Sequence, residues 1–316
     1  MSSGGACRPI LPFGRAERKI MAKKLLLIIN PVSGKMNIKA ELLGIIKVFC
    51  EADFALQTYV TRSSLDAVRY VEKNSAGFDV IVACGGDGTF GEVVSGALRS
   101  RFEGALGFLP CGTTNDMAQS LSLPKNLIRA SRLIAEKEAK PMDFGSFNRT
   151  RYFTYVAAFG AFTDVSYSTD QKLKNVFGHA AYISEAIARL KGLRSYRMKV
   201  NADGVLYEGD FLFGAAANSL SIGGVMKLKK SAVDLCDGYH EIMLIRNPKT
   251  PADLANLSRE LVSGNFENKS VLFFRAKKIV FDCDEEIPWC VDGEFAGRRS
   301  HAEVRNLHGR LRVIYP

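Results

Sequence analysis

The residues best suited to phosphate chemistry lie in a glycine-rich turn from Cys84 to Glu92, which reads CGGDGTFGE. An apolar run, DVIVA, precedes this turn, and a segment with helical character, EVVSGALRS, continues from its last residue. Glycines let backbone amides approach an oxygen-rich ligand closely, and the start of a helix adds partial positive charge. Asp87 adds a carboxylate at the end of the predicted strand, and Thr89 adds a hydroxyl. The turn is therefore a candidate phosphate-binding site.

The glycine spacing of this turn does not identify its ligand. Gly86, Gly88 and Gly91 satisfy the spacing G-x-G-x-x-G of dinucleotide-binding folds, which alone is a weak signal. Such a fold would place a carboxylate about 20 residues beyond the turn for the ribose. The next predicted strand, ALGFLP, ends without an acid, and Asp87 would repel a bare pyrophosphate unless a cation intervened. A tight strand-to-helix turn without a ligand is the alternative interpretation.

Two further polar turns follow predicted strands, Asn30 to Lys35 (NPVSGK) and Pro110 to Asp116 (PCGTTND). The first offers a serine hydroxyl, a close glycine backbone and the Lys35 cation to a phosphate. Strand-like and helix-like segments alternate from residue 23 to about residue 140, which is typical of a doubly wound parallel sheet. Ligands of such sheets bind beyond the carboxyl ends of the strands, where all three turns are expected.

The pattern changes after Pro141. Aromatic and β-branched residues dominate Arg151–Gly160 and Tyr196–Asn218, and Asp203-Gly204 is a strong hairpin signal between two strand-like runs. We therefore expect a second, mainly antiparallel β domain. The predicted divisions are an N-terminal extension at 1–22, expected to be disordered, a nucleotide-binding α/β domain at 23–141, a β-sandwich domain for the substrate at 142–304, and a terminal strand at 305–316 that could return to the first domain.

Three helices can be placed by their sequence signals. Ser63 with Asp66 predicts a capping box at the start of one helix. Thr250, followed by a proline and by Asp253, predicts the start of another. Apolar residues at helical spacing predict a third helix at 178–192.

Composition limits the class of protein. The chain has 316 residues, 47% of them hydrophobic and 24% charged, as in soluble globular proteins. Its net charge of +10 suggests an anionic partner, although a basic surface can also serve solubility alone. Seven scattered cysteines without a C-x-x-C pair indicate a reduced, cytoplasmic protein, and four dispersed histidines suggest no zinc site. No apolar run reaches the ~18 residues of a membrane-spanning helix.

The three turns, in this order, resemble the diacylglycerol kinase catalytic domain family, which includes sphingoid-base kinases and other bacterial lipid kinases. Asn218 with Gly223-Gly224, then Asp237-Gly238, then Asp292-Gly293-Glu294, fit later blocks of the same family. The resemblance extends over residues 23–316, although the middle motif alone is shared with NAD kinases and phosphofructokinases. It implies a Rossmann-like three-layer α/β domain and an antiparallel β-sandwich domain, with the active site in the cleft between them.

The resemblance also assigns residues to ATP. Thr61 ends the second predicted strand, where family members contact the nucleotide, but it could equally be a surface turn residue. Asp116 could simply cap the helix that it begins. The nucleotide-binding residues expected from the resemblance are Asn30, Pro31, Ser33, Gly34, Lys35, Thr61, Gly85, Gly86, Asp87, Gly88, Thr89, Gly91, Gly112, Thr113, Asn115 and Asp116.

Catalysis and metal binding follow from the same resemblance. Glu294 would be the general base that takes the proton of a lipid hydroxyl, with Asp87 as a second catalytic residue. The Asp-Gly pair before Glu294 could instead be no more than a hairpin turn. Phosphoryl transfer requires Mg²⁺, and bacterial members hold a structural Mg²⁺ at positions that match Asp234, Asp237 and Tyr239, partly through backbone carbonyls. Without the resemblance, the Asp237-Gly238 pair would be interpreted simply as a turn.

A lipid acceptor requires contact with a membrane. Basic clusters are attracted to anionic lipid by about 1 kcal/mol per charge near the surface, although a solvated basic face is an equal alternative. We expect peripheral membrane association of a cytoplasmic protein, no nucleic-acid partner, because no recognition motif is present, and a possible homodimer. The basic residues concerned are Arg189, Lys191, Arg194, Arg197 and Lys199, and then Lys227, Lys229 and Lys230.

The sequence thus predicts an ATP-dependent lipid kinase that uses Mg²⁺ and acts on a lipid hydroxyl, converting diacylglycerol to phosphatidic acid. An NAD kinase-like enzyme is the alternative catalytic function, but the turn containing Lys35 fits the lipid kinases better. A nucleotide-binding regulator is the alternative if the protein is not an enzyme. The presence of Asp87, Asp116 and Glu294 argues against that alternative.

Overall fold

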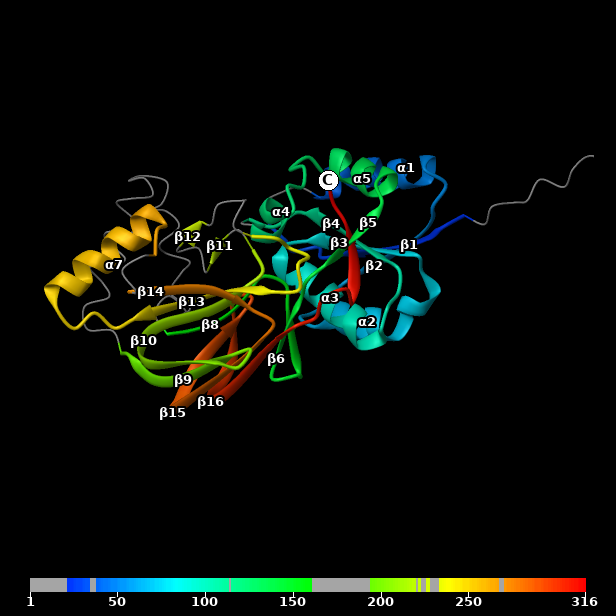
Figure 1. Ribbon diagram of the computed structural model, residues 1–316. Helices are drawn as coiled ribbons and strands as arrows, with labels where there is room; N and C mark the ends of the chain where they lie inside the picture. Colours follow the sequence, from blue (N-terminus) through cyan, green and yellow to red (C-terminus); the bar gives the residue numbers. More distant parts are fainter. Residues whose placement is uncertain are drawn as a thin grey trace, which may run out of the picture.

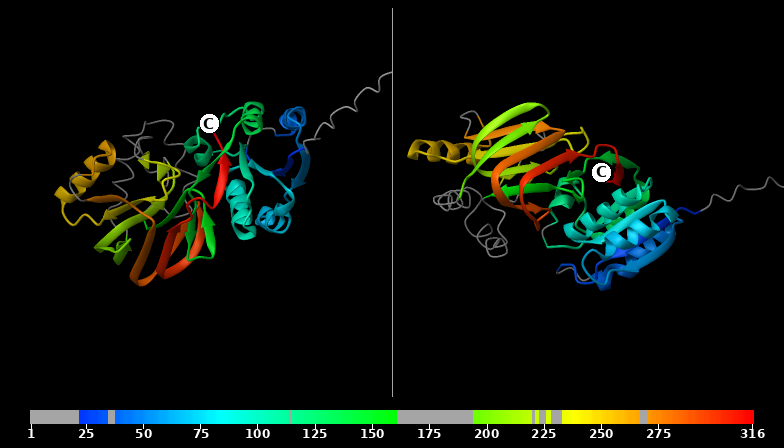
Figure 2. Two further views of the ribbon diagram at one scale, coloured as in Figure 1. Left: turned by 45° about the vertical axis from the view of Figure 1, so that its right-hand side comes forward. Right: turned by 90° about the horizontal axis from the view of Figure 1, so that it is seen from below.

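Two large β-sheets organise the chain, one from its N-terminal part and one from most of the remainder (Figure 1). Figure 2 shows the two parts side by side from two further directions. The computed structural model describes residues 22–34, 38–113, 115–160, 194–219, 221–222, 226–227, 233–266 and 270–316.

The first sheet has six strands in the order β2-β1-β3-β4-β17-β5. Neighbouring strands are parallel except for β17 and β5, so the sheet is mixed. β1 and β3 are uninterrupted apolar runs because helices cover both of their faces. The strands are β1 (Lys24–Ile29), β2 (Ala55–Val60), β3 (Val80–Gly85), β4 (Ala105–Pro110), β5 (Ala139–Met142) and β17 (Leu311–Ile314).

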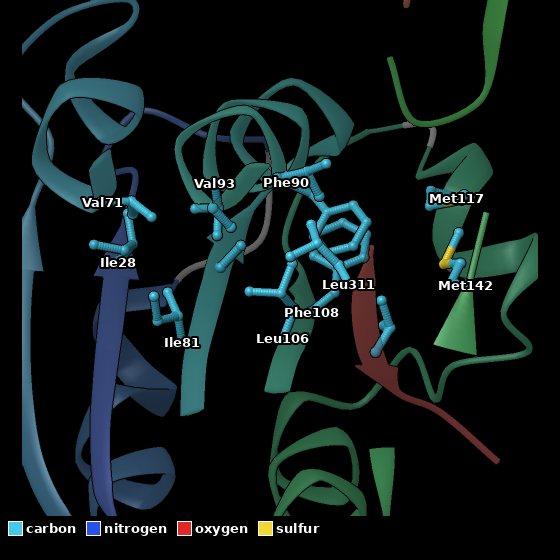
Figure 3. Close-up of a cluster of buried hydrophobic side chains, with 14 of the residues drawn as sticks. Ile28, Val71, Ile81, Phe90, Val93, Leu106, Phe108, Met117, Met142 and Leu311 are labelled. Carbon is cyan, nitrogen blue, oxygen red and sulfur yellow. The ribbon is translucent and has the colours of Figure 1, made fainter. Parts of the chain in front are cut away.

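Helices pack on both faces of this sheet. α2 and α3 cover one face through side chains such as Val71, Phe90 and Val93 (Figure 3). α1 and α5 cover the other face, where Phe49 and Ile134 are buried. The helices are α1 (Ile38–Glu51), α2 (Asp66–Asn74), α3 (Asp87–Ser100), α4 (Asp116–Ser120) and α5 (Leu127–Glu136), with a short 3₁₀ helix at Ser75–Gly77.

The strand pairs of the second sheet are antiparallel, and its order is β14-β13-β10-β8-β15-β16-β6-β7, with β9 paired to β10 and β15. β10 and β15 each pair with β8 near one end and with β9 near the other. The four strands thus form a ring of pairings around an aromatic core that contains Phe159, Phe281 and Trp289. The strands are β6 (Gly145–Phe147), β7 (Arg151–Phe153), β8 (Val156–Gly160), β9 (Tyr196–Ala202), β10 (Val205–Ala217), β13 (His240–Arg246), β14 (Val271–Ala276), β15 (Lys278–Val291) and β16 (Glu294–Asn306).

A helix covers the outer face of the second sheet. α7 (Pro251–Ser263) packs there through Leu257 and Leu261. The remaining strands, β11 (Ser221–Ile222) and β12 (Met226–Lys227), form a separate two-stranded sheet. The predicted fold class, a Rossmann-like α/β domain followed by an antiparallel β domain, is confirmed. None of the described helices is long and apolar enough to cross a bilayer.

The chain passes between the sheets twice, and the two crossings touch. The first crossing, between β5 and β6, contains Asp143 and Phe144, and the second, between β16 and β17, contains Leu307 and His308. The Leu307 amide donates to the Phe144 carbonyl at 2.8 Å. His308 Nδ1 lies 2.7 Å from Asp143 Oδ1. β17 then enters the first sheet between β4 and β5.

The helix-start predictions had different outcomes. The cap of α7 is confirmed, because Thr250 and Asp253 form a reciprocal capping box. The Ser63 capping box is wrong, because α2 begins after Leu65 without a side-chain cap from its own segment. The Asp66 carboxylate instead accepts from the Arg62 amide at 2.9 Å. The carboxylate of Glu92, on α3, caps the start of α2 instead.

Several predicted features fall outside the described residues, so the structure says nothing of them. They are the extension at 1–21, Lys35, the helix at 178–192, Gly223-Gly224, and the basic residues Arg189, Lys191, Lys229 and Lys230.

Candidate active site

Three turns at the carboxyl edge of the first sheet are in backbone contact with one another. Gly34 has a φ of +66°, and a Cβ placed there would lie 1.9 Å from the Cys111 carbonyl oxygen. A Cβ on Gly112 would lie 2.7 Å from Gly86 Cα. Only glycine permits these approaches. The structure therefore brings the three predicted phosphate-binding turns together into one surface.

Side chains lock the first turn to the second. Asn30 Nδ2 donates to Thr89 Oγ1 at 3.0 Å, and Asn30 Oδ1 accepts from the Val32 amide at 3.1 Å. The Thr89 side chain fills the space above Gly85, where a Cβ would lie 2.4 Å from Oγ1. Asn30 and Thr89 thus hold the shape of the turns.

The third turn is closed by Asn115. Its backbone is left-handed, with a φ of 52°. Asn115 Oδ1 accepts from the Gly112 amide at 3.0 Å, and Nδ2 donates to the Gly112 carbonyl at 2.7 Å. Thr113 between them is exposed. The amide of Asn115 therefore shapes the turn, and Thr113 is the residue that it presents to solvent.

Asp87, the first residue of α3, caps the neighbouring helix α4. Its carboxylate accepts from the amides of Asp116 at 2.8 Å and Met117 at 3.1 Å. Burial raises the pKa of Asp87 to about 6. The two backbone N–H groups oppose this shift of the pKa, and the carboxylates of Asp116 and Asp292 add to it. Asp87 thus fixes α4, and its charge faces the carboxylate of the second domain.

The Asp292-Gly293 pair forms a two-residue hairpin between β15 and β16. Its φ values of 48° and 81° are those of a type I′ turn. The half-buried Asp292 residue accepts four hydrogen bonds through its carboxylate, from Thr154 N at 2.7 Å, Thr154 Oγ1 at 2.9 Å, and the amides of Tyr155 and Val156 at 3.0 Å each. Burial raises the pKa of Asp292. Asp292-Gly293 is therefore a hairpin turn, and the same anchored turn also positions Glu294.

The two domains approach closely at this hairpin. A Cβ on Gly91 of α3 would lie 3.6 Å from Asp292 Oδ2. The Tyr155 hydroxyl lies 3.3 Å from a Cβ position at Gly293. Burial raises the pKa of the Tyr155 phenol, and the carboxylates of Asp292 and Asp87 add to that rise. Helix α3, through Gly91, thus brings the glycine turns of the first domain against the second domain.

Glu294 is held in place by an arginine. Arg151 Nη2 donates to Glu294 Oε2 at 2.7 Å, and Arg151 Nη1 donates to the Phe295 carbonyl at 3.0 Å. The Glu294 side chain is nevertheless 67% exposed. It is therefore accessible to a substrate hydroxyl, in an orientation that the guanidinium sets.

Two adjoining clefts meet at Glu294. The first, of about 440 Å³, is lined by Asn30, Ser33, Thr61, Gly86 and Thr89. The second, of about 340 Å³, is lined by Arg99, Arg151, Tyr152 and Asp292. Ser64, Gly88, Glu92 and Glu294 line both clefts.

Thr61 also shapes the wall of the first cleft. Its amide and its hydroxyl both donate to the Ile29 carbonyl, at 2.9 and 3.3 Å. This residue therefore ties the end of β2 to the end of β1. The arrangement could hold a nucleotide along the first cleft, with the Glu294 carboxylate at its end.

Sequence reasoning missed Glu92 and Asp292. Glu92, on α3, accepts from the amides of Leu65 at 2.8 Å and Ala67 at 3.2 Å and so caps α2. Burial raises its pKa. No local signal reveals such a cap, because the partners lie 25 to 27 residues away. For Asp292 the Asp-Gly pair predicted the turn but not the four hydrogen bonds that its carboxylate accepts.

The three residues expected to hold a structural Mg²⁺ lie on one turn before β13. Asp234 Oδ1 accepts from the Cys236 amide at 3.0 Å. Asp237 Oδ1 accepts from the Tyr239 amide at 2.9 Å, while its Oδ2 pairs with Arg275 at 2.8 Å. Among the described residues, no three His, Cys, Asp or Glu side chains are arranged to hold a metal ion. The carboxylates predicted as ligands are thus already engaged with protein donors.

Buried oxygen atoms nevertheless surround this turn. Asp143 is fully buried, and its Oδ2 accepts from the Gly238 amide at 2.7 Å. Asn218 donates through Nδ2 to the Asp143 carbonyl. Burial raises the pKa of the neighbouring Glu241 to about 8. Carboxylate and amide oxygens are the donors that Mg²⁺ prefers, so the chemistry of the region fits a hard cation.

Each half of the chain matches the model of a known domain family. Residues 24–147 match the diacylglycerol kinase catalytic domain. Residues 156–315 match the YegS C-terminal NAD kinase beta sandwich-like domain.

Similar full-length proteins carry a consistent name. A diacylglycerol kinase of Bacillus subtilis (strain 168) is 28% identical over 296 residues, which are 93% of this chain and 97% of the relative. A diacylglycerol kinase of Staphylococcus aureus (strain MRSA252) is 31% identical over 301 residues, 94% of this chain and 93% of the relative. The crystal structure of a putative diacylglycerol kinase from Bacillus anthracis str. Sterne superposes with a TM-score of 0.77 at 26% identity, covering 93% of this chain and 97% of that one.

Proposed function

Since the chain belongs to the diacylglycerol kinase family, a family of kinases with an alcohol acceptor, we propose that it transfers the γ-phosphate of ATP to the hydroxyl of diacylglycerol. The product would be phosphatidic acid. The observation that carries this proposal is the cleft between the first two glycine turns and Glu294, with the third turn packed against both of those turns.

The residues divide the work between holding phosphates and moving a proton. Backbone amides of the turns around Gly34, Gly86 and Gly112, together with the positive end of α3, would hold the phosphates. Glu294 would accept the proton of the acceptor hydroxyl, with Arg151 as the residue that orients it. Mg²⁺, which accompanies ATP in phosphoryl transfer, neutralises charge on the phosphates. Asp87, whose oxygens both cap α4, would act on this site through its charge and through water.

Access to the lipid requires docking on a membrane, and the described basic residues support it only weakly. Arg194 pairs with Glu285, and Lys199 lies 3.8 Å from Glu208. These pairs reduce the positive field of that segment. We therefore expect peripheral binding to anionic membranes to depend more on other parts of the surface. Equal sedimentation with neutral and anionic vesicles would contradict an electrostatic docking mode.

A transfer assay tests the proposed reaction. The protein receives γ-labelled ATP, Mg²⁺ and micelles of diacylglycerol, with sphingosine, phosphatidylglycerol and NAD in parallel. Glu294→Gln should lower the rate by about 100- to 10,000-fold, as expected for loss of a general base. Glu286→Gln, an exposed change on β15, is the matched control and should keep the rate.

Each outcome separates the candidate functions. Label in a chloroform-extractable product of diacylglycerol, lost in Glu294→Gln alone, supports the proposal. Label in NAD would show an NAD kinase-like enzyme instead. ATP binding without transfer to any acceptor would favour a nucleotide-binding regulator.

A further inference from the structure

A half-buried phenol, that of Tyr155, lies beside the hairpin that carries Glu294. Tyr155 directly precedes β8, and its hydroxyl lies 3.3 Å from the position of a Cβ on Gly293, the residue before Glu294. Within the described parts of the chain, no hydrogen bond joins this hydroxyl to another residue. A phenol in such a place usually has a partner, so its O–H group is a donor that a ligand can use.

The protein fixes the backbone of Tyr155 from both sides. The Tyr155 amide donates to Asp292 Oδ1 at 3.0 Å, and the Tyr155 carbonyl accepts from the Asn218 amide at 2.9 Å. Asn218 is itself fully buried. The side chain therefore starts from a rigid point of the second domain, and a donor that is already in place loses little conformational entropy when it binds a ligand.

The Tyr155 side chain connects an apolar environment to an acidic one. Its ring packs against the apolar layer between the second sheet and α7, which contains Phe213 and Leu257. Burial raises the pKa of the phenol, and the carboxylates of Asp292 and Asp87 raise it further. The hydroxyl therefore keeps its proton at neutral pH and is a donor. An acceptor lipid has the same division, with apolar chains joined to a polar end.

We propose that the Tyr155 hydroxyl donates a hydrogen bond to the acceptor lipid, at an ester carbonyl oxygen next to the hydroxyl that receives the phosphate. This inference rests on the proposed kinase function and adds the chemical class that the acceptor site selects. An acylglycerol offers a carbonyl oxygen to the phenol, whereas a long-chain base has an ammonium group, which cannot accept a hydrogen bond. Tyr155 thus contributes to the choice of lipid, and Glu294 takes the proton.

Two lipids and two variants test this contact. Wild type, Tyr155→Phe and the control Tyr207→Phe receive ATP, Mg²⁺ and micelles of either a diacylglycerol or its dialkyl ether analogue, which has no ester carbonyl. Tyr207, on β10, stacks on Phe274, and phenylalanine can keep that stack. We expect Tyr155→Phe to lower kcat/KM for the diacylglycerol by about 3- to 10-fold, as for one neutral hydrogen bond. The kcat/KM for the ether and the KM for ATP should not change, and Tyr207→Phe should change none of these values.

The ratio of the two lipids decides the outcome even if Tyr155→Phe folds poorly, because a smaller folded fraction lowers both rates equally. An equal loss with both lipids would show a structural role and overturn the proposal. An unchanged rate in Tyr155→Phe would also overturn it, since the hydroxyl would then contact only water. The wild type alone should prefer the diacylglycerol to its ether, and equal use of the two lipids would refute the contact without any variant. A wild type that phosphorylates neither lipid would refute the proposed reaction, and this inference with it.

Discussion

Replacing Asp292 with asparagine changes one hydrogen-bond acceptor of a half-buried carboxylate into a donor. Oδ1 accepts from the amides of Tyr155 and Val156, and an asparagine carbonyl can keep both bonds. Oδ2 accepts from the amide and the hydroxyl of Thr154. The hydroxyl can turn to accept from the new NH₂ group, but the Thr154 amide cannot.

The magnitude follows from that single loss. One buried N–H without a partner costs about 1–3 kcal/mol. The neutral side chain no longer buries a charge, which offsets part of this cost. We therefore expect Asp292→Asn to lower the free energy of unfolding by about 1–2 kcal/mol. Asp292→Ala leaves three backbone N–H groups unpartnered and should cost at least about 3 kcal/mol.

Urea unfolding measures both values, and the chain contains a matched control. Asp203-Gly204 is a hairpin of the same kind, with φ values of 48° and 93°. Its aspartate also accepts two backbone amides, from Lys277 at 2.8 Å and Lys278 at 2.9 Å, but it is exposed. Asp203→Asn should change stability by no more than about 0.5 kcal/mol. If Asp203→Asn costs as much as Asp292→Asn, or if Asp292→Asn costs nothing, then burial of the anchor does not set the penalty.

Further predictions concern the carboxyl edge of the first sheet. Gly34→Ala should weaken ATP binding and lower Tm, because its Cβ would overlap the Cys111 carbonyl. Gly77→Ala is the control, since a Cβ there would have no atom within 4 Å. Equal effects of the two changes in calorimetry would contradict the close packing of the turns. Glu92→Ala should reduce the free energy of unfolding by about 1–2 kcal/mol through loss of the α2 cap, measured in urea. Activity should fall as pH drops through about 6, where Asp87 takes up its proton. The stability of the wild type relative to Asp87→Asn should fall as pH rises toward about 6, because the folded state, with its raised pKa, keeps the proton longer than the unfolded chain. A flat difference across that pH range would show that Asp87 is not shifted.

The sequence was sufficient to predict those turns and strands whose signal lies within a short stretch of the chain. The turns after β1, β3 and β4 could be located because each follows an apolar strand and contains residues with special backbone demands, as at Gly34. The Asp292-Gly293 hairpin was likewise visible in its dipeptide. Strand alternation then predicted the parallel part of the first sheet. The spacing of apolar residues and the residue types of turns depend on the local sequence, so these predictions did not require knowledge of distant contacts.

The contacts that complete the site are not local. Asp87 caps α4 across 29 residues, and Glu92 caps α2 across 27. Ser63 satisfied the sequence pattern of a cap, yet an acceptor from another helix took its place. The pairing of Arg151 with Glu294 spans 143 residues. Such partners are set by how sheets and helices pack, which single-sequence patterns do not encode.

The position of β17 has a consequence for synthesis on the ribosome. This strand, Leu311–Ile314, lies between β4 and β5, so these two strands remain unjoined until β17, which follows the whole second domain in the chain, has been translated. The first domain therefore cannot complete its sheet while the second domain is still emerging. Its buried positions Leu311 and Val313 fill the core between helix and sheet. Completion of the first sheet thereby depends on prior synthesis of the second domain.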